Sequence, residues 1–351
     1  MRISDLKRLF KKGVGILTEP LFLKPYFNPK IWGGRKLETE YGFDIPDGKI
    51  GEAWIISGHP HGPATIENGP LKGKTLREAW HEDPAYFGPQ HSQEFPLLVK
   101  ILDAEASLSV QVHPDDAYAA AHEAKGELGK TECWYILKAD PGAYLIYGHH
   151  AKTHEQLKEM IEAGDWEHLL RKYPVKTGDF VYVPSGTIHA LNKGIVALET
   201  QQSSDTTYRL YDYDRKDDQG HRRELHIKQS LDVTTVPFHD PKLDITKEQV
   251  TGGQITTFVK PPLSPHFAVY RLDVDGTMTF TQQAPYTNVT VLDGDGTFSA
   301  DGKDYPIKTG DSFLIPNQIK TWAFTGKLAI VTSTPGGRRI RLRIIRCPTY
   351  S

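Results

Sequence analysis

Between residues 107 and 113 the chain reads Ser-Leu-Ser-Val-Gln-Val-His, in which apolar and polar side chains alternate. Side chains two positions apart in a β-strand point to the same face. One face of this strand would carry Ser109, Gln111 and His113, and the other Leu108, Val110 and Val112. An amide oxygen and an imidazole nitrogen on a rigid strand can bind the same ion. The segment therefore predicts half of a metal site.

Two later segments could supply the other half. Glu132 begins an aromatic strand, and His189 follows the turn Val183-Pro-Ser-Gly-Thr-Ile. Together with Gln111 and His113 they form a set of two imidazoles, one carboxylate and one amide oxygen. No thiolate is present, which excludes a closed zinc site of the cysteine type and leaves room for water or substrate oxygens. Zn²⁺ fits such a set, as do Mn²⁺, Fe²⁺ and Co²⁺. Gln111 and His113 by themselves could instead form the polar face of an exposed strand.

Three further side chains could act beside the ion. Lys130 lies two positions before Glu132 and should share its face, which would place an ammonium near the metal. Residues 199–212 are too polar for a core strand. In this segment Arg209 could bind an anionic or polyhydroxyl substrate through its planar fork, and Asp205 could accept a proton. A solvated lysine and an ordinary surface loop are the alternatives.

Length and composition restrict the class of protein. The 351 residues favour two domains, and a net charge of -2 indicates no attraction for nucleic acid or an acidic membrane. We therefore expect a small-molecule partner or a second copy of the chain. The two cysteines, Cys133 and Cys347, indicate no disulfide and favour a cytoplasmic location. The sequence contains no apolar run of about 20 residues and no secretory signal pattern, so we expect a soluble protein that is not exported.

The body of the chain is predicted to be mainly β. Short runs rich in Val, Ile, Tyr and Phe recur between Gly, Pro, Asn and Asp residues, as in antiparallel sheets. Two segments near 153–172 have helical spacing instead. The first, 154–163, carries an apolar stripe and follows Thr153 as a cap; the second covers 165–172. We expect them to form a short helical insertion that decorates a barrel.

An internal repeat divides the chain. Residues 176–189, Lys-Thr-Gly-Asp-Phe-Val-Tyr-Val-Pro-Ser-Gly-Thr-Ile-His, match residues 308–320, Lys-Thr-Gly-Asp-Ser-Phe-Leu-Ile-Pro-Asn-Gln-Ile-Lys. The first copy has His189 where the second has Lys320 or its neighbour, so the second copy should lack metal ligands. The predicted domains are a leader over 1–19, a catalytic domain over 20–237, a degenerate second domain over 238–335 and a basic tail over 336–351. We expect the Arg-rich end, 338–346, to be an edge strand or a tail.

Several motifs over roughly 20–335 carry a family resemblance. They are Lys30-Ile-Trp-Gly-Gly, Leu98-Val-Lys-Ile-Leu-Asp, Ser107-Leu-Ser-Val-Gln-Val-His-Pro-Asp, Gly129-Lys-Thr-Glu, Val183-Pro-Ser-Gly-Thr-Ile-His-Ala and Ser204-Asp-Thr-Thr-Tyr-Arg. With these motifs the chain resembles the shorter bacterial form of the type I mannose-6-phosphate isomerases, which are zinc enzymes of the cupin superfamily. The resemblance implies two cupin (jelly-roll) β-barrels and one Zn²⁺ per chain. It implies the metal ligands Gln111, His113, Glu132 and His189.

The resemblance also implies a reaction. Mannose 6-phosphate and fructose 6-phosphate would interconvert through an enediol, with the metal as a Lewis acid. Arg209 would stabilise the charge of the enediolate, and Lys130 and Asp205 would serve in proton transfer and ring opening. Ser109 would orient the substrate or its phosphate. Lys130 and Arg209 would also bind the substrate. Trp32, Glu52 and Trp54 are expected to support the site. The protein would be a monomer or a homodimer.

Two alternatives belong to other classes. A bicupin could bind a sugar phosphate without turning it over, and the presence of Lys130 and Arg209 argues against this. A cupin oxygenase or epimerase would usually offer three histidines and one glutamate, and Gln111 argues against that arrangement.

Overall fold

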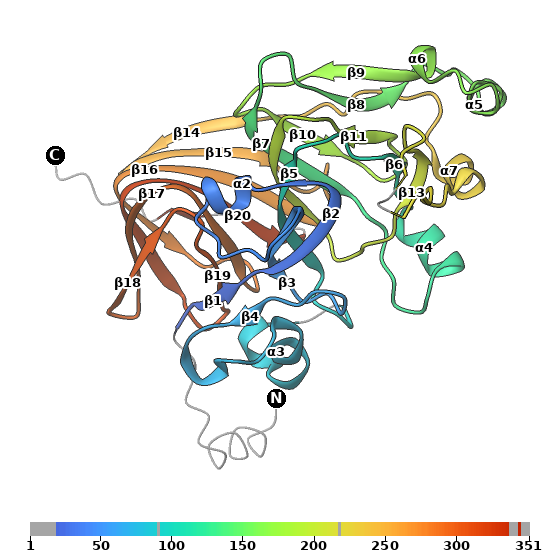
Figure 1. Ribbon diagram of the computed structural model, residues 1–351. Helices are drawn as coiled ribbons and strands as arrows, with labels where there is room; N and C mark the ends of the chain where they lie inside the picture. The colour runs from blue at the N-terminus through green and yellow to red at the C-terminus, as the bar shows by residue number, and fades with distance from the viewer. Residues whose placement is uncertain (1–18, 90–91, 217–218, 337–342, 345–351) are drawn as a thin grey trace. The chain divides into compact units, whose positions relative to one another are not determined.

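The computed structural model describes residues 19–89, 92–216, 219–336 and 343–344. The chain forms two compact units (Figure 1). Unit 1 contains Met1–Lys24, Pro63–Gln93 and Ile245–Ser351, and unit 2 contains Pro25–Gly62 and Glu94–Asp244. These bounds differ from the continuous segments predicted from the sequence. The difference arises because two early strands pair within the sheet of unit 1, so that segments distant in sequence join one unit.

Unit 1 contains one antiparallel sheet with ten described strands in the order β14-β15-β16-β20-β17-β19-β1-β4, with β18 on β17 and β21 on β16. The strands are β1 (Leu21–Lys24), β4 (Thr65–Ile66), β14 (Thr246–Val250), β15 (Gly253–Val259), β16 (Phe267–Thr281), β17 (Thr287–Ala300), β18 (Lys303–Lys308), β19 (Ser312–Ile315), β20 (Thr321–Pro335) and β21 (Arg343–Ile344). Alternate side chains of β15–β20 form one apolar core that includes Phe298, Phe313 and Trp322.

The part of unit 1 that follows β4 is helical between residues 69 and 87. It comprises the 3-10 turns Gly69–Leu71 and Pro84–Phe87 and the helix α3 (Leu76–Glu82). Thr75 caps α3: its side chain accepts a hydrogen bond from the main-chain N–H of Glu78, whose carboxylate accepts one from the N–H of Thr75. This reciprocal pair satisfies two main-chain donors that a helix start leaves open.

Unit 2 is built from two antiparallel sheets. The six-stranded sheet has the order β10-β7-β12-β5-β2-β3, and the five-stranded sheet has the order β13-β6-β11-β8-β9. The first contains β2 (Tyr26–Gly34), β3 (Ile50–Ser57), β5 (Leu97–Ala104), β7 (Glu132–Ala139), β10 (Phe180–Val183) and β12 (Ile195–Gln202). The second contains β6 (Val110–Val112), β8 (Tyr144–His149), β9 (Leu170–Pro174), β11 (His189–Leu191) and β13 (Tyr208–Tyr211).

One apolar cluster joins the inner faces of these two sheets. Trp134 of β7 and Ala197 of β12 pack in it with Tyr147 of β8 and Leu191 of β11. A second cluster covers the other face of the five-stranded sheet and includes Val110 and Val112. The mainly β fold predicted from the sequence is confirmed.

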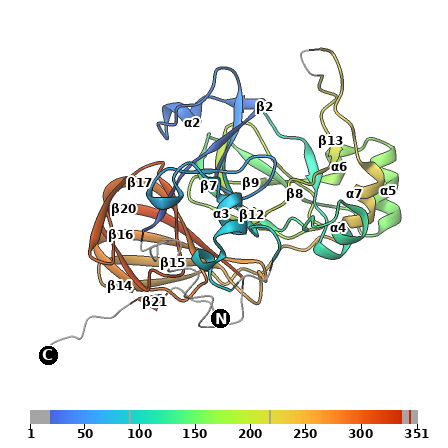
Figure 2. The same cartoon turned by 90° about the horizontal axis from the view of Figure 1, so that it is seen from below.

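Helices gather beside the five-stranded sheet (Figure 2). They are α4 (Asp116–His122), α5 (His154–Glu162), α6 (Trp166–Leu169) and α7 (Ile227–Val233); the short α2 (Lys36–Thr39) follows β2. Leu157 and Ile161 of α5 pack in the second apolar cluster, the one with Val110 and Val112. The Thr153 side chain caps this helix as predicted. No helix in the described ranges combines the length and apolar character needed to span a bilayer.

Two local predictions were wrong. The second predicted helix, 165–172, ends at Leu169, and Leu170–Pro174 form β9 because they pair with β8. Leu108 does not share a face with Val110: the strand begins only at Val110, and Leu108 packs in the inner cluster. In the first case pairing between strands outweighs local periodicity, and in the second the alternation begins only where the strand does.

The two copies of the internal repeat form the same turn. The N–H of Lys176 donates to the carboxylate of Asp179 over 2.9 Å, and the N–H of Lys308 donates to that of Asp311 over 2.8 Å. The strands β10 and β19 follow, each reaching a proline. The next strand begins at His189 in one copy and at Thr321 in the other, so Thr321, the neighbour of Lys320, stands at the position of the histidine.

The predicted leader lies almost wholly outside the described residues, as does most of the predicted C-terminal tail. Of the Arg-rich end, only Arg343–Ile344 are described, and they form β21 beside β16. Cys347 is also outside the described part, whereas Cys133 is a buried free thiol.

Candidate metal centre and its pocket

The predicted ligands come from both sheets of unit 2. Gln111 of β6 lies opposite His189 of β11 in the strand register, and His113 follows β6 directly. Glu132 begins β7 in the other sheet. His113, Glu132 and His189 are fully buried and their ligand atoms all lie within 4.8 Å of one another. Their side chains are therefore a candidate metal site.

The distances converge on one point. Glu132 Oε1 lies 3.1 Å from His189 Nε2, and Glu132 Oε2 lies 3.5 Å from His113 Nε2. The amide Nε2 of Gln111 lies 3.4 Å from each of the two ring Nε2 atoms. A half-turn of this amide about its last torsion exchanges nitrogen for oxygen and presents Oε1 to the same point. All four predicted ligands are thus brought together.

Main-chain carbonyls orient both imidazoles. His113 Nδ1 lies 2.9 Å from the carbonyl oxygen of Thr206, and His189 Nδ1 lies 2.8 Å from that of Thr187. A carbonyl only accepts, so each Nδ1 carries the proton and each Nε2 directs a lone pair to the centre. This second hydrogen bond is usual for histidines that bind metals.

The electrostatics of the cluster suit a cation. Burial raises the pKa of Glu132, but the opposing charges, first that of the Lys130 ammonium, hold the pKa well below its ordinary value. Burial, followed by the charge of Lys130, keeps the pKa of His113 far below its ordinary value. Glu132 Oε1 is buried and has no hydrogen-bond donor among the described residues. An ionised oxygen without a donor, facing two lone pairs, fits a divalent cation.

Two glycines allow the loops of the site to approach each other. A Cβ at Gly129 would lie 2.5 Å from main-chain atoms of Asp115 and Asp116, so only glycine permits this approach just before Lys130. Gly186 has φ +82°, and its N–H donates to the carbonyl of His113 over 2.8 Å. A left-handed residue at this turn connects the two histidine segments, and glycine adopts this conformation at little cost.

The other predicted residues surround the same centre. Lys130 Nζ donates to Glu132 Oε2 over 2.8 Å and lies 2.9 Å from His113 Nε2, as the shared strand face predicts. Arg209 of β13 donates from Nε to the buried Ser109 hydroxyl over 3.3 Å. One pocket is lined by Lys130, Arg209 and Ser109 together with Asp205 and Gln111.

Trp32, Glu52 and Trp54 also line this pocket, in keeping with their expected supporting position. The Trp54 ring N–H donates to Glu52 over 2.7 Å, and Lys30 lies 3.6 Å from the same carboxylate. These contacts fix part of the pocket wall.

The sequence analysis did not single out the ion pair of Lys100 and Glu199 as a site feature. Lys100 on β5 lies opposite Glu199 on β12, with 3.3 Å between Nζ and Oε2 and both side chains about 5% exposed. Trp134 donates to Glu199 over 2.9 Å, and the Lys100 ammonium lies 4.9 Å from the centre of the Trp54 ring. Both charged residues line the pocket. One signal in the sequence could have indicated this pair: Lys100 is a charged residue in the middle of a segment that is otherwise rich in apolar residues.

We expect Lys100→Met to lower the free energy of unfolding by about 3–5 kcal/mol, because Glu199 would remain buried without its cation. Burial lowers the pKa of Lys100, but Glu199 and Glu52 outweigh it and raise the pKa, so the ammonium is charged. Urea denaturation measures the change. Lys158→Met is the control: its pair with Glu162 is largely exposed and should contribute less than about 0.5 kcal/mol. Equal, small changes in both variants would contradict the expectation.

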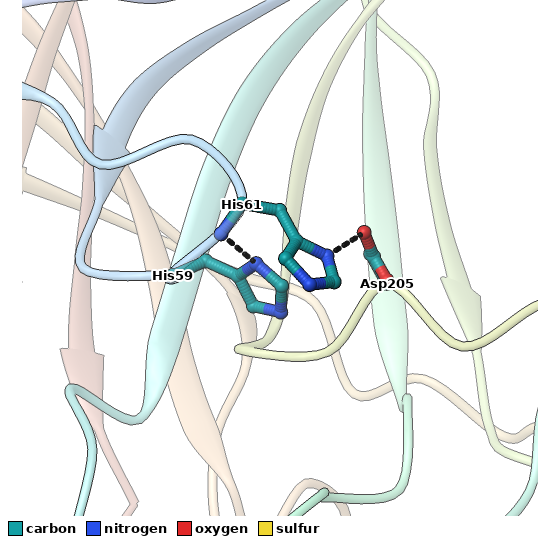
Figure 3. A group of neighbouring side chains, drawn as sticks. All are labelled: His59, His61 and Asp205. Atoms are coloured by element: carbon teal, nitrogen blue, oxygen red, sulfur yellow. Dashed lines mark hydrogen bonds and ion pairs between the residues drawn. The ribbon is translucent and has the colours of Figure 1, made fainter.

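His59, His61 and Asp205 form a second group outside the buried centre (Figure 3). The main-chain N–H of His61 donates to His59 Nδ1 over 3.2 Å, and His61 Nδ1 lies 2.9 Å from Asp205 Oδ2. Burial lowers the pKa of His59 to about 4, so its ring is neutral and accepts this bond. His61 thus holds the carboxylate of Asp205 at the rim of the pocket. The sequence analysis missed both histidines, because they are distant from Asp205 in the chain.

We expect Asp205→Asn to lower the pKa of His61, because the hydrogen bond and charge of Asp205 raise it. The pair therefore stabilises the fold fully below the unfolded pKa of histidine, about 6.5, and this contribution is lost as pH rises through the raised pKa. At the acid end, burial raises the pKa of Asp205, but the hydrogen bond from His61 and the neighbouring positive charges together lower it, so the contribution is lost again below the lowered pKa of Asp205.

NMR titration of the histidine ring protons measures this pKa. His168 of α6, whose pKa is raised by Asp165 just before that helix, serves as the internal control and should titrate identically in both proteins. An unchanged titration of His61 in the variant would mean that the pair does not persist in solution.

The fold and the site together indicate the class of protein. A two-sheet β unit with a buried His-Glu-His cluster and a pocket above it is typical of the cupin superfamily. Residues 254–335 match the model of the mannose-6-phosphate isomerase cupin domain, and residues 21–150 match that of the phosphomannose isomerase type I catalytic domain.

Curated proteins extend this match over most of the chain. A mannose-6-phosphate isomerase of Streptococcus mutans is 52% identical over 90% of this chain and 98% of its own length. One of Bacillus subtilis is 47% identical over 90% of this chain and 99% of its own. A crystal structure of the mannose 6-phosphate isomerase from Bacillus subtilis superposes with a TM-score of 0.86 at 46% identity, covering 90% and 99% of the two chains. The chain belongs to the type I mannose-6-phosphate isomerase family.

Proposed function

We propose that this protein interconverts mannose 6-phosphate and fructose 6-phosphate through an enediol, with one Zn²⁺ bound by Gln111, His113, Glu132 and His189. The observation that carries the proposal is the buried cluster of His113, Glu132 and His189 beneath a pocket lined by cationic side chains. Close relatives named for this activity support it.

A divalent cation held there would act as a Lewis acid toward the substrate oxygens on C1 and C2. The protein side chains supply the rest. Arg209 faces the pocket with its guanidinium and stabilises the negative charge that develops on these oxygens. Lys130 and Asp205 transfer protons during ring opening and between C1 and C2, and Ser109 orients the sugar. The walls formed by Trp32 and Trp54 exclude water from the reacting carbons.

The expected domain roles follow from the same proposal. The segment 20–237 contains every residue assigned to catalysis, and 238–335 would be a degenerate cupin. In the described part of unit 1, no three His, Cys, Asp or Glu side chains gather as candidate ligands. The cytoplasmic location and the monomer or homodimer state remain predictions.

A coupled assay tests the function. Purified protein with mannose 6-phosphate should produce fructose 6-phosphate, which phosphoglucose isomerase and a dehydrogenase convert to a nicotinamide signal. Removal of the metal with a chelator should abolish the signal, and added Zn²⁺ should restore it. Activity that survives complete metal removal would reject the mechanism. Binding of the sugar phosphate without turnover would favour the alternative of a non-catalytic bicupin.

A further inference from the structure

A cluster of arginines surrounds one carboxylate next to the pocket. The side chain of Asp212, which follows β13, is 5% exposed and accepts hydrogen bonds from two guanidinium groups. Arg223 donates from Nε to Oδ2 over 2.8 Å and from Nη2 to Oδ1 over 2.6 Å. Arg215 donates from Nη2 to Oδ1 over 2.5 Å and from Nη1 to the carbonyl of Ser107. Asp212 therefore fixes the direction of both arginines.

The cluster carries excess positive charge. Arg209 donates from Nε to Ser109 and from Nη1 to the carbonyl of Glu224 over 2.9 Å, and no carboxylate pairs with it in the described chain. Two of the three guanidinium groups bind the carboxylate of Asp212 and the third lies near it, so three positive charges face one negative charge and two are left in excess. Burial and then the charge of Arg223 lower the pKa of Arg209, as expected where the local potential is positive.

This charge faces the pocket through only two of the three arginines. Arg209 and Arg223 line it, with the hydroxyl-bearing Ser109 and Thr207 beside them, whereas Arg215 does not. Among described residues no acceptor occupies Nη1 of Arg223. A guanidinium that is anchored on one side and open on the other is a suitable donor for a tetrahedral oxyanion.

The strand register shows which of the two arginines lies beside the predicted metal ligands. Arg209 lies opposite the predicted metal ligand Gln111 in the pairing of β13 with β6. Arg223 comes from the segment after β13, binds Asp212 and lines the pocket. Arg209 is therefore the arginine on the strand beside the metal ligands, and Arg223 enters from outside the sheet.

We propose that Arg223, held in place by Asp212, binds the phosphate group of the substrate and so makes the enzyme specific for the phosphorylated sugar. This inference rests on the proposed isomerase function. The two excess positive charges match the two negative charges of a phosphate monoester at neutral pH. The reacting end of the sugar then lies at the metal and beside Arg209, and its phosphate lies at Arg223.

The variant Arg223→Ala tests the proposal, with Arg222→Ala as matched control. Arg222 is the adjacent arginine, pairs with the exposed Asp214 over 3.1 Å and does not line the pocket. We expect Arg223→Ala to raise KM for mannose 6-phosphate by about 10- to 100-fold, as for the loss of a charge-assisted hydrogen bond, with kcat changed less than about threefold. Arg222→Ala should match the wild type.

Three further measurements separate phosphate binding from a structural role. Inorganic phosphate should inhibit Arg223→Ala more weakly than the wild type. Turnover of unphosphorylated mannose, however slow, should be the same in both. Arg223→Lys should recover part of the affinity lost in Arg223→Ala, because lysine keeps the positive charge but lacks the planar guanidinium. If Arg223→Ala does not fold, Arg223→Lys replaces it as the test variant.

An unchanged KM and unchanged inhibition by phosphate would overturn the proposal, as would equal losses with mannose and mannose 6-phosphate. Isothermal titration of inorganic phosphate into the wild type and Arg223→Lys separates it from the proposed function. Weaker phosphate binding by Arg223→Lys, in a protein whose wild type shows no isomerase activity, would support the phosphate site and reject the isomerase. If the wild type is active and neither Arg223→Lys nor Arg223→Ala changes its phosphate affinity, the isomerase function is supported and the phosphate site at Arg223 is rejected.

Discussion

Glu132→Gln should lower metal affinity by at least about 100-fold and isomerase activity by about 1,000-fold. The side chain keeps its size and its place at the start of β7, but it loses the negative charge that faces His113 and His189. The remaining neutral ligands would bind a divalent cation weakly. Metal content after dialysis, measured by atomic emission, and the coupled assay give the two quantities.

Glu105→Gln is a suitable control for Glu132→Gln. Glu105 lies in the same unit, is exposed and pairs with Lys36 over 2.8 Å away from the pocket. This variant should retain both metal and activity. Full retention of metal by Glu132→Gln would remove Glu132 from the ligand set and leave the proposed centre without its only negative charge.

Arg209→Ala should reduce kcat by about 100- to 1,000-fold and leave KM within about threefold, because a charge placed against the enediolate acts in the transition state. This pattern is the opposite of that expected for Arg223→Ala. Steady-state kinetics of both variants under the same conditions therefore distinguish the two arginines. Arg171→Ala, which removes an arginine paired with Asp240 outside the pocket lining, should leave both constants unchanged.

A rise in KM with unchanged kcat would assign Arg209 to substrate binding alone. The Ser109 hydroxyl, which accepts the Nε hydrogen bond, gives a further check. Ser109→Ala should share the direction of the Arg209→Ala effect on kcat but be weaker, because the guanidinium keeps its charge and its bond to Glu224.

The sequence was sufficient to select the candidate metal ligands. Gln111 of β6 and His113 directly after it point to the same centre, as alternation along an extended segment predicts, and Lys130 just before β7 and Glu132 at its start do the same. The turn before His189 was likewise readable from Gly-Asp and Pro-Ser-Gly. The structure confirms that these local patterns bring the candidate ligands together.

Local pattern failed where pairing partners decide the conformation. Residues 170–172 were predicted to be helical, but they pair with β8 and so form part of β9. The assignment of β1 and β4 to unit 1 also depends on their partners, since β1 pairs with β19 from the far end of the chain. No short window of sequence contains that information.

The sequence by itself determined which side chains can bind a cation and on which strand faces they lie, because these depend on residue type and a period of two. Only the tertiary structure decided how charges distant in sequence combine. It set Lys100 against Glu199, joined His61 to Asp205, and placed Arg215 and Arg223 on one carboxylate. A pair of charges interacts only over a few ångströms, and that distance is fixed by the pairing of whole strands and the packing of loops.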